Sequence, residues 1–278
     1  MKRRGARPAA CFVMMTIASV VLLFPVYWMM MTAVTPVSEI LSRDPPLLPH
    51  LGSLSFDAFA AVIARRPFLL WTANSMIVGG ASSLISLTAA ALAGYSLSRY
   101  AFPGIRFAGA VLLLGKLAPP ALIIIPLFIM FSVGGLLESY GGLVLAHVAT
   151  GVPLATWLMK GFFDRIPREV EQAAMIDGCT RLGALRHVIL PLTRPGLASC
   201  FVYLLLVSWG EFVFGRTLMS KPDHRVLTVG LQSFSAEYQV DWPGLMAAGT
   251  LTLIPIVVMF VLLEPFLVSG MTKGALAN

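Results

Sequence analysis

Apolar residues run along this chain in long blocks that short polar segments separate. Six blocks are each long enough for a helix to cross the hydrocarbon core of a bilayer, which takes about 20 predominantly apolar residues. The pattern predicts an all-α polytopic membrane protein with one transmembrane domain over residues 1–278. The predicted spans are 11–34, 70–94, 107–131, 141–162, 196–219 and 244–268.

The first apolar block has the basic start of a secretory signal peptide. It follows the sequence MKRRGARP but runs from Cys11 to Val34. A cleavable apolar core has roughly 7 to 15 residues. We therefore expect this block to remain in the protein as a membrane anchor.

Composition and charge agree with a membrane protein. Hydrophobic residues make up 58% of the chain and charged residues 12%, whereas soluble domains carry about 25% charged residues. The net charge of +7 comes from basic residues scattered between apolar blocks, a distribution that favours membrane orientation over nucleic acid binding. If the N-terminus, with Lys2, Arg3 and Arg4, is cytoplasmic, most basic residues lie in cytoplasmic loops, as the positive-inside rule requires.

Alternation of the spans then places both termini in the cytoplasm and predicts a multi-pass membrane protein. The first outside loop, 35–69, is long and could form a small external cap. It is rich in proline, with Pro36, Pro45, Pro46 and Pro49.

The sequence contains no pattern for a metal or a nucleotide. Cys11, Cys179 and Cys200 form no CxxC pair and have no histidine at ligand spacing, so neither a disulfide framework nor a zinc site is expected. The phosphate-binding pattern GxxxxGK[ST] is also absent. We expect no metal and no cofactor, and any ATP would have to bind to a separate subunit.

One predicted cytoplasmic loop, 165–194, is polar and unusually long. Pro167 stands where a helix would begin, and Glu169 and Glu171 complement the positive end of its dipole. Gly178 is placed to end this helix after roughly three turns. The segment is predicted to carry a short helix that no membrane span requires.

A second short helix is predicted after this glycine. Thr180 can cap it, Leu182, Leu185 and Ile189 share one face, and Pro191 is expected to end it. Two interpretations fit such a pair of helices: a docking surface for a soluble partner, or an amphipathic element lying on the lipid headgroups.

Particular residues of this loop favour the docking surface. Gln172-Ala173-Ala174, Asp177-Gly178 and Ile189-Leu190-Pro191 have the spacing of the EAA loop in permease subunits of ABC importers. The sequences TANSMIVGG, GYSLSRYAFPGIR and SWGEF extend the agreement over nearly the whole chain. The chain thus resembles the six-span, maltose-type sugar permease subunit of binding-protein-dependent importers.

This resemblance implies a multi-pass translocation subunit of a prokaryotic cytoplasmic (inner) membrane, which forms half of a solute pathway and is not an enzyme. Its implied partners are a second homologous permease, an ATP-binding cassette ATPase dimer, an external solute-binding protein and membrane lipid, with no nucleic acid. Contacts with the binding protein would come from the outside loops 35–69 and 220–243. The solute would be a sugar, a polyol or a sugar phosphate.

The resemblance also implies which residues contact the ATPase. In the family this loop docks into a cleft of the ATPase subunit, and its glutamate forms an ion pair there. That glutamate falls on Gln172 in this chain, so we expect the adjacent Glu171 to substitute for it. The implied coupling residues are Glu171, Gln172, Ala173, Ala174, Asp177, Gly178, Leu190 and Pro191.

Polar residues at membrane depth indicate a packed bundle around a pathway. Ionisable side chains are costly there and must face protein or water, so Lys116 either lines the pathway, pairs with a glutamate or extends to the interface. The predicted pathway residues are Asn74, Trp209, Glu211 and Phe212, although Asn74 would also serve as a bond between helices. Pro119, Pro120, Pro126 and Pro255 are expected to interrupt the third and sixth spans.

Two other functions compete with the importer. An intramembrane hydrolase would use Ser82 as nucleophile and His147 as base, but Ser83 occupies the place where a GxSG pattern has glycine. A secondary transporter working alone would not need the cytoplasmic loop, and no inverted repeat is visible. The importer subunit is the function that the sequence favours.

Overall fold

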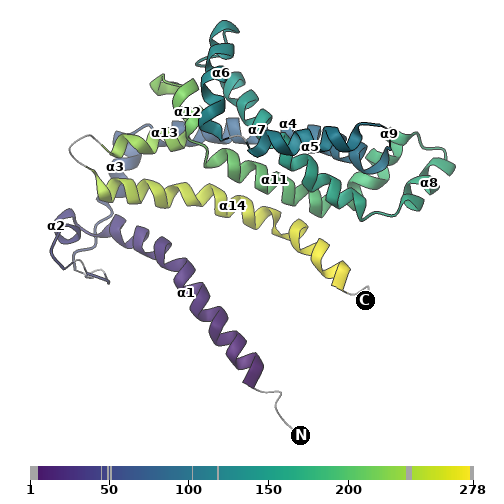
Figure 1. Cartoon of the computed structure of the whole chain (residues 1–278). Coiled ribbons are helices and arrows are strands. Elements are labelled where there is room, and N and C mark those ends of the chain that lie inside the picture. Colours follow the sequence, from purple (N-terminus) through teal and green to yellow (C-terminus); the bar gives the residue numbers. More distant parts are fainter. Residues whose placement is uncertain are drawn as a thin grey trace. The chain divides into compact units, whose positions relative to one another are not determined.

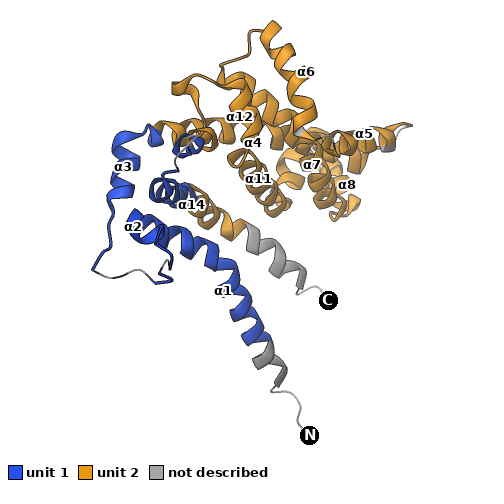
Figure 2. Cartoon of the chain, turned by 60° about the vertical axis from the view of Figure 1, so that its left-hand side comes forward, with its two compact units in different colours: residues 1–69, 231–254 blue, residues 70–230, 255–278 orange. Residues whose placement is uncertain are grey.

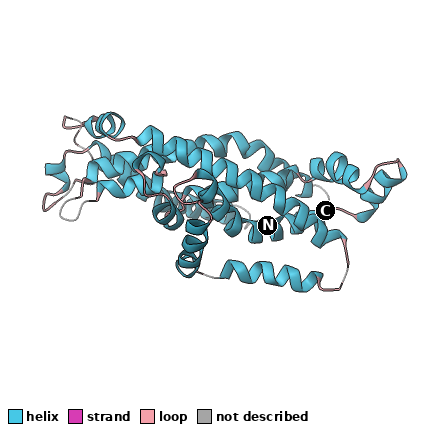
Figure 3. Cartoon of the chain, turned by 90° about the horizontal axis from the view of Figure 1, so that it is seen from above, coloured by secondary structure: helices cyan, strands magenta, loops and turns pink. Residues whose placement is uncertain are grey.

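The computed structural model of the chain describes residues 6–44, 46–48, 50, 52–101, 103–117, 119–235 and 240–275, so Lys2, Arg3, Arg4, Pro45 and Pro49 lie outside the described residues. Within these ranges the elements are helices (Figure 3). The longer ones are α1 (Ala6–Val34), α3 (Asp57–Arg65), α4 (Phe68–Arg99), α5 (Ile105–Leu117), α6 (Pro120–Val133), α7 (Tyr140–Asp164), α8 (Arg168–Ile176), α11 (Arg194–Trp209) and α14 (Trp242–Ala275). The shorter ones are α2 (Val37–Ile40), α9 (Arg181–Ala184), α10 (Leu190–Leu192), α12 (Val213–Leu218) and α13 (Leu227–Leu231).

Among the described residues, four helices are long and apolar enough to cross a membrane. They cover Cys11–Val34, Phe68–Arg99, Tyr140–Asp164 and Trp242–Phe266. Two further pairs of helices meet at sharp bends, and the number of spans rises to six if each pair is one span. The all-α polytopic fold is therefore confirmed at the level of four to six spans.

The predicted third span is not one straight helix. α5 and α6 meet at an angle of 99°, and Pro119 and Pro120 stand at the start of α6 as predicted. A proline there costs little because the first amide groups of a helix have no partner within it. Pro126 and Pro255 lie inside α6 and α14, which continue past them, so the predicted interruptions at these two positions are wrong.

The predicted fifth span, 196–219, is also divided. α11 ends at Trp209, and α12 begins only at Val213. The break contains Gly210, Glu211 and Phe212, and the Glu211 carboxylate accepts the amide hydrogens that begin α12. The Glu211 side chain thus accepts hydrogen bonds that backbone carbonyls would accept in one continuous helix.

The chain divides into two compact units (Figure 2). Unit 1 comprises residues 1–69 and 231–254 and contains α1, α2, α3 and the first part of α14. Its centre includes the buried Ala33 and Val62, and the Ser55 amide donates to the Val34 carbonyl at 2.9 Å. The 18-residue apolar window of α1 has no buried residue, so this helix presents its apolar surface outward.

Unit 2 comprises residues 70–230 and 255–278. One core cluster joins Val78 of α4, Leu143 of α7 and Phe214 of α12. The other joins Met159 of α7 to Ile189, in the π-helical turn Leu185–Ile189 that follows α9. The bundle of α4, α7 and α11 thus has a core at each end, and the second core extends into the predicted coupling loop.

Small residues allow the helices of unit 2 to approach closely. A Cβ atom on Gly94 of α4 would lie 2.8 Å from the Lys160 amide nitrogen and 2.9 Å from the Thr156 carbonyl oxygen of α7. These are backbone atoms of a neighbouring helix and cannot turn aside. A Cβ on Gly80 of the same helix would meet nothing within 4 Å.

Gly94→Ala is expected to destabilise the bundle by about 1–3 kcal/mol, the usual cost of overpacking. Gly80→Ala is the matched control because it makes the same change in the same helix without a clash. Thermal unfolding in detergent should show a lower Tm for Gly94→Ala and an unchanged or higher Tm for Gly80→Ala. Equal Tm values for the two variants would contradict the close crossing of α4 and α7.

Candidate coupling segment and solute pathway

The first helix of the predicted coupling loop ends at a glycine turn, as the sequence predicts. α8 follows Pro167 and ends at Ile176. Gly178 has φ +92°, a left-handed conformation that only glycine adopts without strain. Its amide donates to the Met175 carbonyl at 3.1 Å, which closes the end of the helix.

The second helix departs from the prediction in part. Thr180 caps α9 as expected, with its hydroxyl accepting the Gly183 amide at 3.1 Å. The helix then widens into the π-helical turn, where more residues fit in each turn and the faces before and after it fall out of step. Leu182 is consequently 68% exposed, and Pro191 lies within α10 instead of ending the helix.

The predicted coupling residues fall on two sides of the segment. Gln172, Ala173, Asp177 and Gly178 are exposed, and Ile176 beside them is 86% exposed. We call these five residues the coupling surface. Leu190 and Pro191 are half-buried, whereas Ala174 and Glu171 are buried.

Glu171 does not offer a carboxylate to an external partner, contrary to the expectation that it substitutes for Gln172. Its Oε2 lies 3.0 Å from Arg99 Nε, and the two side chains are 7% and 5% exposed. Its Oε1 accepts a hydrogen bond from the Tyr95 hydroxyl. Breaking a buried pair by removing one partner typically costs about 3–5 kcal/mol because a charge stays buried alone. The carboxylate is therefore committed to α4.

Asn74, one of the predicted pathway residues, ties three segments of unit 2 together. Its Nδ2 donates to the carbonyls of Asp223 and Arg225 at 3.0 and 2.9 Å, and its Oδ1 accepts from the Tyr140 hydroxyl at 2.8 Å. The side chain is 2% exposed. This is the interhelical bond that the sequence offered as the alternative, and it leaves no free group for a solute.

The two predicted aromatic residues differ in access. Trp209 is buried and borders a small apolar cavity with Met76 and Pro255, so its ring is not open for stacking on a sugar. Phe212 is partly exposed in the break between α11 and α12. Lys116 is exposed near the end of α5. It is not the ion-pair partner of Glu211, whose carboxylate contacts the Phe214 and Gly215 amides and His147.

Glu211 belongs to a polar cluster inside unit 2. Its two carboxylate oxygens accept the Phe214 and Gly215 amides at 2.9 and 3.0 Å. His147 Nε2 lies 3.5 Å from Glu211 Oε2, an electrostatic contact rather than a hydrogen bond. On the other side of the ring, His147 Nδ1 is 2.6 Å from the Ser208 hydroxyl. The cluster thus joins α7, α11 and the start of α12.

The hydrolase hypothesis does not fit this cluster. The Ser82 hydroxyl bonds to the Gly79 carbonyl and to the Ser208 hydroxyl, at 3.2 and 3.3 Å, and His147 contacts Ser208 instead. The cavity among these groups has about 20 Å³, which suffices for one water molecule but not for a substrate. The predicted pairing of Ser82 with His147 is wrong, because a serine of α11 occupies that place.

A tie that the sequence did not indicate holds the loop before α7. Glu138 adopts φ +57°, and its carboxylate accepts the Ser220 and Lys221 amides at 2.9 and 3.0 Å. Burial raises the pKa of Glu138, but these amides and the Lys221 charge outweigh burial and hold the pKa below its ordinary value. His224 Nδ1 contacts the Glu138 carbonyl at 2.9 Å.

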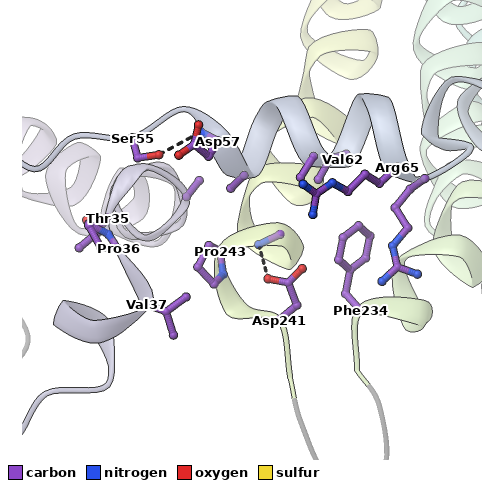
Figure 4. A pocket seen from close by; sticks show the side chains of 15 residues that line it. Thr35, Pro36, Val37, Ser55, Asp57, Val62, Arg65, Phe234, Asp241 and Pro243 are labelled. Carbon is purple, nitrogen blue, oxygen red and sulfur yellow. Dashed lines mark hydrogen bonds between the residues drawn. The ribbon is translucent and has the colours of Figure 1, made fainter.

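A cavity of about 640 Å³ lies within unit 1 (Figure 4). Arg65 and Arg66 border it from the end of α3, and the Arg66 guanidinium stacks over the Phe234 ring at 5.1 Å. On the other side, Asp241 caps the start of α14 by accepting the Gly244 amide at 3.0 Å. The cavity combines both charges with an aromatic face and involves the two predicted outside loops.

The residues that the structure describes contain no cluster of three or more His, Cys, Asp or Glu side chains that could hold a metal ion. Cys11, Cys179 and Cys200 are free thiols.

Comparison with known proteins identifies this apolar helical bundle as a membrane transport permease. The chain belongs to the family described as binding-protein-dependent transport system inner membrane component, which matches residues 82–273. It is therefore a multi-pass inner membrane permease subunit and not an enzyme, as the resemblance of its motifs implied.

Curated relatives extend over nearly the whole chain. The inner membrane ABC transporter permease protein YcjP of Escherichia coli is 33% identical over 92% of this chain and 91% of its own length. The maltodextrin transport system permease protein MdxG of Bacillus subtilis is 31% identical over 95% and 94%. The diacetylchitobiose uptake system permease protein DasC of Streptomyces coelicolor is 33% identical over 91% of each.

The fold is similar to that of a solved importer. A chain in the crystal structure of a bacterial ABC transporter that imports the acidic polysaccharide alginate has a TM-score of 0.78. It is 20% identical, and the match covers 95% of this chain and 98% of that one. This similarity supports the helical architecture.

Replacing Asn74 by alanine is expected to lower stability by about 1–3 kcal/mol, since the Asp223 and Arg225 carbonyls and the Tyr140 hydroxyl lose their partner. The Tm in detergent should fall by several degrees. If Asn74 contacted the solute instead, the variant would keep its Tm and raise the KM for uptake. That second result would contradict the structural tie.

Glu138→Gln is expected to lower stability by about 1 kcal/mol at pH 7 by weakening two bonds to an ionised acceptor. The ordinary carboxyl pKa is 4.5 and the folded pKa is lower, so the stabilisation is complete above pH 4.5 and is lost as the pH falls through the folded pKa. The Tm difference between wild type and variant should shrink as the pH falls below 4.5. A difference that is constant with pH would show that the charge plays no part.

Proposed function

We propose that this chain is one of two permease subunits of an ATP-driven importer in a prokaryotic cytoplasmic membrane. It would form six spans with both termini cytoplasmic, with α5 and α6 together as the third span and α11 and α12 together as the fifth. ATP would bind to a separate ATPase dimer. The observation that carries this proposal is the coupling surface, which exposes an apolar and small-residue face on a helix that the membrane does not need.

Burial supports docking to a protein over lying on lipid headgroups. α8 is fixed to unit 2 by the buried Ala174 and Glu171, and it turns Gln172, Ala173 and Ile176 outward. Ile176 is 86% exposed beside Gln172 and Asp177, so a docked protein would remove this apolar side chain from water. Ala173 adds a small contact that allows close approach.

The second permease would cover the outward surface of α1. The 18-residue apolar window of α1 has no buried residue within this chain, so its surface must face lipid or another apolar helix. An external solute-binding protein would contact 35–69 and 220–243, where the cavity of unit 1 offers Arg65, Arg66 and Asp241 as polar partners.

The solute class is proposed from the relatives, which are named for maltodextrin and diacetylchitobiose transport. We propose a sugar or a related polyhydroxylated compound. Phe212, partly exposed at the break after α11, is the aromatic residue placed to stack on a sugar ring. Glu211 is committed to α12 and would shape the pathway rather than bind the solute.

Ile176→Glu is expected to reduce association with the proposed ATPase partner at least tenfold, because it puts a charge into a contact that should exclude water. Copurification of the two subunits from membranes measures this association. Leu48→Glu is the matched control: Leu48 is also exposed, at 73%, but lies in the predicted outside loop.

Gly178→Val tests the same contact through the backbone, since valine strains φ +92° and moves α9 against α8. It should also reduce copurification. ATPase binding that Ile176→Glu and Gly178→Val leave at the wild-type level would rule out this docking site.

A further inference from the structure

The two acids of α8 point in opposite directions. In a helix, residues 169, 173 and 176 share one face, and Glu169, Ala173 and Ile176 are all exposed. Glu171 lies on the opposite face and is buried. Glu169 is thus the acid that faces outward on the side of the coupling surface. Glu171 faces inward and contacts other residues of this chain.

The Glu171 carboxylate connects α8 to the end of α4. It pairs with Arg99 and accepts the Tyr95 hydroxyl. Arg99 also donates from Nη2 to the Ile166 carbonyl at 3.0 Å, so one guanidinium holds both the start of the coupling segment and its helix. The planar guanidinium of arginine presents several nitrogen donors, so it can contact two different acceptors at once.

Further contacts converge on the same end of α4. Arg168 Nη2 donates to the Ser98 carbonyl at 3.3 Å. The Arg181 guanidinium lies over the Tyr100 ring, 5.4 Å from its centre. Both α8 and α9 are therefore attached to residues 95–100, at the end of unit 2 where Figure 1 shows these two helices.

α4 leads from this attachment into the polar cluster. It is one helix of 32 residues, about 48 Å long at 1.5 Å per residue, with no proline inside it. Ser82, which bonds to Ser208 of α11, lies near its middle. A displacement of the Arg99 end would reach this cluster because an unbroken helix moves as a rigid element.

We propose that Glu171 is the inner anchor of the coupling helix: through Arg99 and Tyr95 it joins α8 to α4, so that a displacement of the coupling surface moves α4. This inference rests on the proposed function and deepens it. Glu171 is a positioning residue that does not contact the ATPase, and the anchor converts docking into movement of the pathway.

The test separates docking from coupling in the complete importer, reconstituted in liposomes with its ATPase, second permease and binding protein. Glu171→Gln keeps the shape of the side chain and removes its charge. We expect ATPase copurification within twofold of wild type, and solute transported per ATP hydrolysed reduced at least tenfold. Arg99→Gln should behave in the same way, and Arg99→Lys should recover part of the transport because it restores the charge.

Asp164→Asn is the matched control. It removes an acid from a neighbouring ion pair, with Lys160 at 2.5 Å, whose side chains are 26% and 43% exposed. Exposed pairs contribute little, so the ratio of transport to hydrolysis should not change. Tyr95→Phe provides a milder second variant in case Glu171→Gln does not fold; it deletes one hydrogen bond and should lower the ratio severalfold.

Three results would overturn the anchor. The first is transport per ATP at the wild-type level in Glu171→Gln, or in Tyr95→Phe if Glu171→Gln does not fold. It would show that coupling does not need the contacts of Glu171 with Arg99 and Tyr95. Loss of ATPase binding equal to that of Ile176→Glu would make Glu171 a contact residue. A fall equally large in Asp164→Asn would show a general effect of charge. Absence of ATPase binding in the wild type would instead refute the proposed function.

Discussion

The close crossing of α4, α7 and α11 is the constraint on which the rest of unit 2 depends. Gly94 lets the backbone of α7 come within contact distance of α4, and a Cβ on Gly151 would lie 2.9 Å from the Leu204 side chain of α11. In lipid, helices associate mainly through packing and interhelical hydrogen bonds, because the surrounding chains are as apolar as leucine. Because these two positions are glycines, the helices approach closely, and this determines how near their polar groups can lie to one another.

This proximity brings polar residues from different helices of the bundle into contact. Ser208, His147 and Glu211 form a connected chain of contacts across three elements. Asn74 also joins separate segments: it lies near the start of α4 and donates hydrogen bonds to two carbonyls of the loop before α13. Such groups stabilise a specific arrangement of helices, because a buried polar group without a partner is costly. The space left among them is small.

The coupling segment combines a local design with a tertiary one. Gly178 and Thr180 determine where its two helices end and begin, which depends only on backbone conformation and a side-chain cap. The direction in which α8 faces depends on Arg99 and Tyr95, more than 70 residues earlier in the chain. The coupling segment therefore folds from local signals, but α4 determines its orientation. This arrangement fits the proposed role, in which docking of the ATPase displaces the segment and the segment displaces α4.

The sequence by itself determined the apolar blocks, the glycine turn at Gly178, the cap at Thr180 and the family, because periodicity, left-handed backbone and motif spacing are local properties. It also located the break at Pro119. It could not show that α11 ends at Trp209, since Glu211 caps the next helix only when the chain turns there. Only the tertiary structure decided that Glu171 faces inward and that Ser208, not Ser82, meets His147. These outcomes depend on partners from distant helices, and a polar residue shows nothing of its partner until packing brings the two together.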